Sequence, residues 1–259
     1  MTAREALDGL SCFSLRTLSL ALRNPSELPR YISYCLKKYD ELVGNGLTCR
    51  GPLTPAENLT ITLPAFHAGG GMSFGELVIL ARVTQTLKPR TVFEIGTYNG
   101  LTTAVFLLNS DPDAAIVTMD LPTGPAEEYS RMPSDQELVA SRQLGSVPRA
   151  LGLGRYTQLL CDSMAFDPSH YLNSVDLGLI DAAHDLAHVQ NDTLKMARMI
   201  SDGGMVFWHD YGGKGALRPL AHYLDALGKR ASIYRIPDTS LAWAPGRELK
   251  QAVGLAARI

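Results

Sequence analysis

The chain has 259 residues, of which 46% are hydrophobic and 19% are charged. This globular balance excludes wholesale disorder, and the length suits one large α/β domain with additional segments. The net charge of −2 and the pI of about 6.3 give no electrostatic reason to expect a nucleic-acid or membrane partner. The four cysteines lack C-x-x-C spacing, so we expect free thiols in a reducing cytoplasm, with neither a zinc site nor a disulfide framework.

The first 71 residues are expected to form a helical extension. The opening stretch carries Arg4, Glu5 and Asp8, which makes it a poor signal peptide and too broken for a membrane span. An amphipathic helix is expected there, and residues 26–43 show a second helical pattern that a Gly-Pro-rich stretch ends. Residues 58–64 suit a short β segment. This extension could supply acceptor contacts or the interface of a homo-oligomer, most simply a dimer.

A helix is predicted from Ser73 to Leu87. Ser73 suits the N-cap, and Glu76 three residues later completes a capping-box pattern. Lys88 and Pro89 end the helix.

From Arg90 onward, strand patterns alternate with helix patterns. The predicted strands are Thr91–Ile95, Ile116–Met119, Tyr156–Leu160, Val175–Ile180 and Met205–Trp208, and the helices between or after them are Leu101–Asn109, His188–Ile200 and Leu217–Leu227. A turn is expected at Gly203-Gly204, and strand-like pieces at Ala231–Ile236 and Leu241–Ala244. Such alternation predicts an α/β fold with a mostly parallel sheet and helices on both faces.

A cofactor site is predicted where these strands end, because ligands of open α/β sheets sit outside the carboxyl ends of the strands. The first strand runs into a turn that begins with Gly96 and ends with Gly100. Asp120 ends the next strand, where a carboxylate can hold both hydroxyls of an adenosine ribose. Asp162-Ser163 could contact the adenine. A lone G-x-x-x-G is weak evidence, and a tight strand-to-helix connection is the plainer alternative.

A second group of polar residues follows the last two parallel strands. Asp181, His209 and Asp210 could form a facial site for Mg²⁺ or Mn²⁺. The alternative is that Asp181 caps a helix and His209-Asp210 only makes a turn. His184 has an unperturbed pKa near neutrality and could accept a proton, or it could be a structural histidine at a helix N-terminus.

Four segments carry a family resemblance. FEIGTYNGLTT resembles the first motif of class I methyltransferases, while GGGMSFGEL, LIDAAHD and GGMVFWHDYG resemble the small-molecule O-methyltransferases. That group includes catechol, caffeoyl-CoA and bacterial macrolide-sugar enzymes. The resemblance covers roughly Gly69 to Ala244, except for a stretch after Asp120. It implies a Rossmann-like S-adenosylmethionine-dependent methyltransferase domain over residues 72–259.

The resemblance also implies roles for individual residues. The cofactor would be bound by Glu94, Gly96, Thr97, Tyr98, Gly100, Thr102, Asp120, Asp162, Ser163 and Asp181. A divalent cation, Mg²⁺ or Mn²⁺, would be held by Asp181, His209 and Asp210. His209 departs from the carboxylates or amide usual in the family, which favours a transition metal or means that the site is lost. His184 would be the general base, with Asp181 beside it as a catalytic residue.

Residues 121–154 are expected to form a lid insertion over the acceptor, partly helical from Ser134 to Leu144. The predicted reaction is methyl transfer from S-adenosylmethionine to a hydroxyl of a small molecule, as in natural-product biosynthesis. The alternatives are a metal-dependent hydroxylase-like relative, a nicotinamide-dependent oxidoreductase on a similar fold, and a cofactor-binding protein without catalysis. The oxidoreductase lacks support from the glycine spacing and from any Tyr-x-x-x-Lys pair.

Overall fold

The computed structural model describes residues 47–52, 59–64, 71–122, 133–212 and 217–255. The chain divides into two compact units, residues 1–45 and 46–259, and every described residue belongs to the second. The helices expected before residue 44 therefore lie outside the described residues. No helix in the described part of the chain is long and apolar enough to span a bilayer.

The described residues form one eight-stranded sheet in the order β1-β7-β8-β6-β5-β2-β3-β4. The strands are β1 (Thr48–Cys49), β2 (Thr91–Ile95), β3 (Ala115–Asp120), β4 (Thr157–Leu160), β5 (Val175–Ile180), β6 (Ile200–Trp208), β7 (Tyr234–Arg235) and β8 (Ala242–Pro245). All neighbouring pairs are parallel except those that involve β8, which runs antiparallel to β6 and β7. The predicted mostly parallel sheet is confirmed.

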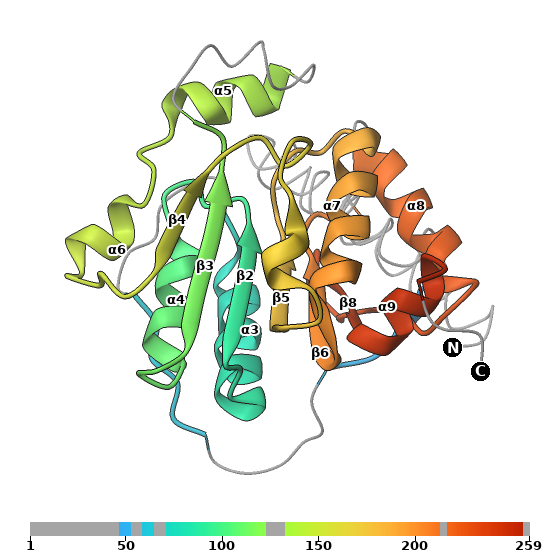
Figure 1. The fold of residues 1–259 in the computed structure, drawn as a ribbon, viewed down its shortest axis with the longest axis horizontal. Coiled ribbons are helices and arrows are strands. Elements are labelled where there is room, and N and C mark those ends of the chain that lie inside the picture. Colours follow the sequence, from blue (N-terminus) through green and yellow to red (C-terminus); the bar gives the residue numbers. More distant parts are fainter. Residues whose placement is uncertain (1–46, 53–58, 65–70, 123–132, 213–216, 256–259) are drawn as a thin grey trace, which may run out of the picture. The chain divides into compact units, whose positions relative to one another are not determined.

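Each face of the sheet carries its own hydrophobic core, because side chains alternate between the two faces along each strand. Phe207 packs in the cluster with α3 (Phe74–Leu87) and α4 (Leu101–Asn109), whereas its neighbour Trp208 packs in the other cluster. That second cluster includes side chains of α7 (Leu186–Met199), α8 (Arg218–Gly228) and α9 (Gly246–Ala252). The helices thus form layers on both faces (Figure 1).

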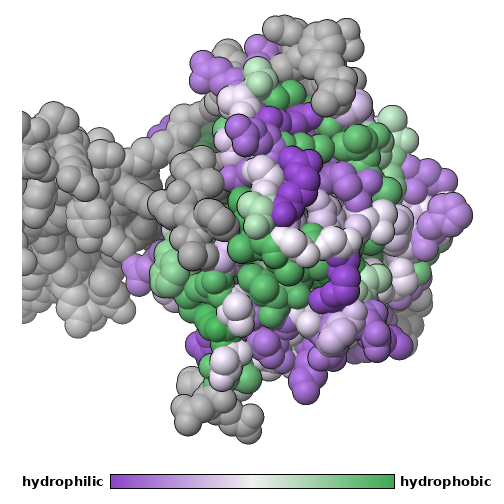
Figure 2. Space-filling view, turned by 90° about the vertical axis from the view of Figure 1, so that its left-hand side faces the viewer, coloured by the Kyte–Doolittle hydropathy of each residue, from purple (hydrophilic) through white to green (hydrophobic). Residues whose placement is uncertain are grey.

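The β4 strand lies at one end of the sheet, and Figure 2 views the molecule from that side. Apolar side chains gather there between polar ones. Leu160 on β4 and Leu151, the C-cap of α6 (Ser146–Ala150), are exposed apolar residues. This strand has only four residues, which limits the free edge that another chain could pair with.

Local signals account for several element boundaries. Ser73 is the N-cap of α3, and the Ser73–Glu76 capping box is complete. Lys88 ends the helix in the left-handed conformation, with its N–H bonded to the carbonyl of Thr84. β2, α4 and β5 have the predicted bounds.

The expected turn at Gly203-Gly204 is wrong. α7 ends at Met199 and β6 begins at Ile200, so both glycines lie inside the strand. The register between β5 and β6 shifts over this stretch, and a Cβ on Gly204 would come within 2.8 Å of the Asp176 carbonyl oxygen. The glycines therefore accommodate an irregular stretch of strand close to its neighbour.

The short β segment expected at residues 58–64 is also wrong for the described residues 59–64, which form no strand. Here the backbone of Thr62 bonds to a side chain of α4: Thr62 N–H donates to Asn109 Oδ1 at 2.9 Å, and Asn109 Nδ2 donates to the Thr62 carbonyl at 2.7 Å. An amide side chain thus satisfies the groups that a strand partner would satisfy.

Candidate active site

A cavity of about 380 Å³ opens at the carboxyl ends of β2, β3, β4, β5 and β6, within the size range of small-ligand pockets. The predicted residues that line it are Gly96, Thr97, Tyr98, Thr102, Asp120, Asp162, Ser163, Asp181, His184, His209 and Asp210. Leu138, Val139 and Arg142 contribute from α5 (Pro133–Ser141) and the segment after it. In Figure 1, α5 lies beyond the carboxyl end of β3.

The two glycines of the predicted cofactor turn are required by their neighbours. Gly96 has a φ of +103°, and a Cβ there would overlap the carbonyl oxygen of Asp181. Gly100 caps α4 with a φ of +80°, and a Cβ would meet Pro148. Gly100 does not line the cavity, so the tight-connection alternative explains this glycine, and Gly96 serves both the connection and the cavity wall.

Glu94 is almost fully buried and does not line the cavity. Thr103 donates its hydroxyl to the Glu94 carboxylate at 2.5 Å, which directs the carboxylate toward α4. Burial raises the pKa of Glu94 to about 8, although hydrogen bonds from Thr103 and Thr118 oppose the rise. A direct contact between Glu94 and a cofactor stays a prediction.

Asp120 orders the turn after β2. Its Oδ2 accepts the N–H groups of Thr97 and Tyr98 at 3.1 and 2.7 Å, and its Oδ1 accepts the N–H of Leu121 at 2.7 Å. Tyr98, on the cavity wall, has a φ of +49°, a conformation that this carboxylate helps to hold. Asp120 thus joins the ends of β2 and β3 at the predicted ribose position.

Arg142 enters the same place from the segment after α5. Its Nη1 lies 3.2 Å from Asp120 Oδ1, and its Nη2 donates to the carbonyls of Leu121 and Pro122 at 2.7 and 3.1 Å. The side chain is only 6% exposed, so the ion pair lies inside the cavity wall. A ribose at Asp120 would share that carboxylate with the guanidinium.

The predicted adenine residues lie on the loop after β4. Met164 N–H donates to Asp162 Oδ1 at 2.8 Å, and α7 holds the Ser163 carbonyl through Asn191 at 3.0 Å and Lys195 at 2.5 Å. Both predicted residues line the cavity, on a loop that is tied to a helix.

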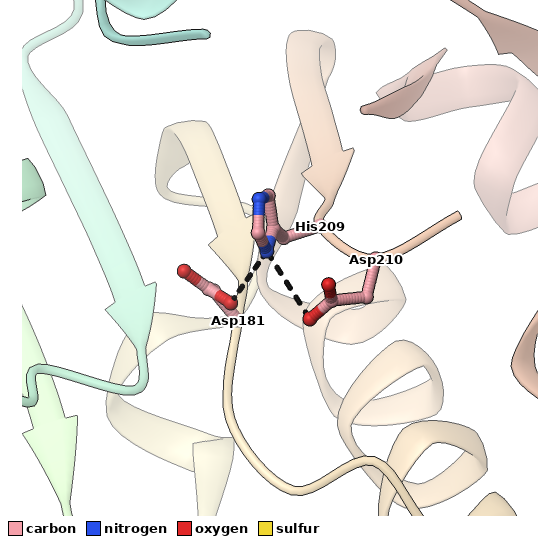
Figure 3. A group of neighbouring side chains, drawn as sticks. All are labelled: Asp181, His209 and Asp210. Carbon is pink, nitrogen blue, oxygen red and sulfur yellow. Dashed lines mark ion pairs between the residues drawn. The ribbon is translucent and has the colours of Figure 1, made fainter. Parts of the chain in front are cut away.

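Asp181, His209 and Asp210 lie together at the ends of β5 and β6 (Figure 3). Each offers one ligand atom, and these atoms lie within 4.8 Å of one another. His209 Nδ1 is 3.2 Å from Asp181 Oδ1 and 3.1 Å from Asp210 Oδ2. Asp210 has a φ of +62°, a strained conformation of the kind that clusters at functional sites. The predicted metal-ligand group is therefore assembled in space.

The other nitrogen of His209 faces a different pair of residues. Nε2 is 3.0 Å from Ser240 Oγ and 3.4 Å from Glu76 Oε2. Burial alone would lower the pKa of His209, but Asp181, Asp210 and Glu76 raise it far above its usual range. The ring thus lies between carboxylates on both sides.

His184 lies between the carboxylates of Asp135 and Asp210. Nδ1 is 2.7 Å from Asp135 Oδ1 on α5, and Nε2 is 2.7 Å from Asp210 Oδ2. Burial alone would lower the pKa of His184, but Asp135 and Asp210 raise it to about 10. In this arrangement the imidazole is protonated at neutral pH and has no free lone pair, so a general-base role requires that it first separate from Asp210.

Residues 93–211, from β2 past the end of β6, match the family described as a methyltransferase domain. Over these residues the chain is similar to a methyltransferase domain. The predicted Rossmann-like fold is confirmed, and the match supports the predicted S-adenosylmethionine-dependent methyltransferase family.

The chain is similar in fold to several solved structures. A cofactor-bound protein from MTB is 19% identical, with 70% of this chain and 84% of that chain covered and a TM-score of 0.50. A Staphylococcus aureus protein named as a candidate caffeoyl-CoA O-methyltransferase is 12% identical, with 66% and 82% covered and a TM-score of 0.50. A methyltransferase from Podospora anserina with bound SAH is 16% identical, with 66% and 77% covered and a TM-score of 0.49. No curated protein matches the chain in sequence.

Sequence reasoning missed four site residues: Glu76, Asp135, Arg142 and Ser240. Glu76 was recognised only as a capping residue, and Arg142 falls within the predicted lid without a role of its own. Glu76 and Ser240 also lie outside the matched residues 93–211. Nothing in the local sequence marks Glu76 beyond its role in the cap, and nothing marks Ser240.

Proposed function

We propose that this methyltransferase transfers the methyl group of S-adenosylmethionine to a hydroxyl of a small molecule, with a divalent cation at Asp181, His209 and Asp210. This proposal rests mainly on one observation: these three side chains line the same cavity as Asp120 and the glycine turn. One cavity thus offers a cofactor side at β2, β3 and β4 and a reaction side at β5 and β6.

The cofactor is proposed to lie with its ribose at Asp120, its adenine at Asp162 and Ser163, and its methionine end at Gly96, Thr97 and Thr102. Three backbone N–H groups orient the Asp120 carboxylate at this position. Because the family match identifies a methyltransferase domain, S-adenosylmethionine is favoured over a nicotinamide cofactor.

The donor set suits a divalent cation. Four carboxylates, from Glu76, Asp135, Asp181 and Asp210, face the two imidazoles, so the cluster keeps two negative charges even when both rings are protonated. Carboxylate oxygens favour Mg²⁺ or Mn²⁺, and the imidazole of His209 adds affinity for transition metals such as Mn²⁺ or Fe²⁺. A bound cation would lower the pKa of the acceptor hydroxyl and orient its oxygen.

His184 is proposed as the proton acceptor. Asp135 holds its Nδ1 and also accepts its backbone N–H at 3.2 Å, which orients the ring. Asp210 Oδ2 is shared between the rings of His184 and His209. If the Asp210 carboxylate turned away from His184 and toward a cation held with Asp181 and His209, it would release His184 Nε2. The pKa of the His184 imidazole would then fall, and the ring could accept a proton.

The acceptor is proposed to be small. The cavity has a volume of about 380 Å³ and is lined by the metal-ligand group on its reaction side. α5 closes over it with the apolar side chains Leu138 and Val139, which suits a lid over a compact, partly apolar acceptor. Residues 121–154 are accordingly proposed as the lid. Of the extension predicted over residues 1–71, residues 48–49 belong to the sheet as β1, so residues 1–45 are proposed to supply the acceptor or subunit contacts.

The metal requirement is tested by chelation. Metal-stripped protein should lose methyl transfer to a panel of hydroxylated acceptors but keep most of its affinity for S-adenosylmethionine, and added Mn²⁺ or Mg²⁺ should restore turnover. Full turnover in excess EDTA, with no metal found by elemental analysis, would show that Asp181, His209 and Asp210 serve only as a polar turn.

A further inference from the structure

Glu76 is a buried carboxylate on α3. It does not line the cavity, but it contacts His209 on the side of the ring that faces away from Asp181 and Asp210. Its Oε1 accepts the N–H and the hydroxyl of Ser240, each at 2.7 Å, and its Oε2 accepts the N–H and the hydroxyl of Ser73 at 2.7 and 2.8 Å. Only the Ser73 contacts are needed for the capping box. The contacts with Ser240 and His209 join α3 to the end of β6.

The direction of these hydrogen bonds determines what Ser240 offers to His209. A serine hydroxyl has one proton and two lone pairs. Because the Ser240 proton is donated to Glu76 Oε1, Oγ can only accept from the ring nitrogen 3.0 Å away. Glu76 Oε2, at 3.4 Å from the same nitrogen, is also only an acceptor. Both neighbours therefore require a proton on His209 Nε2.

A proton on Nε2 leaves Nδ1 as the nitrogen that can bind a cation, since a neutral imidazole carries one N–H and one lone pair. Nδ1 is the nitrogen that faces Asp181 and Asp210 in Figure 3. A histidine that binds a metal commonly donates its other N–H to a carboxylate or carbonyl, which holds both tautomer and ring orientation.

We infer that Glu76 and Ser240 are positioning residues that hold His209 as its Nε2–H tautomer and direct its Nδ1 lone pair at a divalent cation shared with Asp181 and Asp210. This inference rests on the proposed metal-assisted function. Neither residue touches the cation; Glu76 orients the Ser240 hydroxyl, and the hydroxyl orients the ring.

The test is calorimetric titration of Mn²⁺ into the metal-stripped, cofactor-free full chain, well below the melting temperature of each variant. Ser240→Ala and Glu76→Gln should weaken Mn²⁺ binding by about 10- to 100-fold, the usual effect of losing such a partner. Ser240→Thr, which keeps the hydroxyl, should bind nearly as the wild type does. Glu137→Gln, a change of the same kind at an exposed position on α5, is the matched control.

The melting temperature without metal separates positioning from stability, because Glu76→Gln also weakens the α3 cap. If folded Ser240→Ala and Glu76→Gln bind Mn²⁺ as the wild type does, the positioning role is overturned while the metal site stands. If the wild type binds no Mn²⁺, the proposed metal site fails, and the positioning role fails with it.

Discussion

The carboxyl group of Glu94 lies inside the sheet, where burial raises its pKa to about 8. A glutamate in the unfolded chain has a pKa of about 4.3. Between these values the folded protein binds more protons than the unfolded chain, so the contribution of Glu94 to the free energy of unfolding falls as pH rises. Glu94→Gln should remove up to about 4 kcal/mol of this decline between pH 5 and pH 8. The free energy of unfolding of both proteins is measured by denaturant titration at pH 5 and pH 8. An equal change between these pH values in the wild type and in Glu94→Gln would contradict the raised pKa of Glu94.

His184 lies where the lid and the reaction site meet, so its substitution separates chemistry from stability. If it accepts the proton of the acceptor, His184→Ala should lower turnover by about 10²- to 10⁴-fold with little change in cofactor affinity. His170→Ala, at an exposed histidine outside the cavity lining, is the control. A folded His184→Ala protein with wild-type turnover and pH dependence would exclude the base role.

At the scale of residues, the sequence predicts site residues that directly follow a strand better than site residues that come from distant parts of the chain. Asp181, His209 and Asp210 could be grouped because neighbouring parallel strands end at one edge. Glu76 and Ser240 lie 164 residues apart in the chain, and their bond depends on how α3 lies relative to the segment before β8. No local pattern carries such information, so the partner of His209 Nε2 became visible only in three dimensions.

At the scale of elements, Arg142 attaches the segment that follows α5 to the cofactor side of the cavity. The guanidinium contacts Asp120 and the carbonyls of Leu121 and Pro122, and no other basic side chain of the described residues lines this cavity apart from histidines. Arg142→Ala should loosen the lid, with amide hydrogen exchange in residues 133–141 rising at least several-fold in the cofactor-free protein. Arg149→Ala on α6 is the control, and unchanged exchange in α5 would show that other contacts hold the lid.

The boundaries of elements were predictable where local chemistry determines them. The Ser73–Glu76 cap and Lys88 mark the ends of α3, and β2, α4 and β5 follow their apolar patterns. β1 was missed because it has only two residues and forms by pairing with β7, far along the chain. α9 was missed as well. β6 begins earlier than predicted because pairing with β5 resumes across two glycines that locally favour a turn.

At the scale of the whole molecule, two separate cores leave the carboxyl edge of the sheet free for ligands. Side chains of α3 and α4 fill one face, and side chains of α7, α8 and α9 fill the other. The polar residues that could bind cofactor and metal are thereby concentrated at one edge, where the parallel strands β2 to β6 end. The account places the cofactor and the cation side by side along this edge.

The most direct test is diffraction at the manganese absorption edge from crystals grown with the demethylated cofactor and Mn²⁺. The account predicts an anomalous peak among Asp181 Oδ, His209 Nδ1 and Asp210 Oδ, with the ribose at Asp120. A cofactor whose ribose lies away from Asp120, or an anomalous map without a peak at these three side chains, would contradict it.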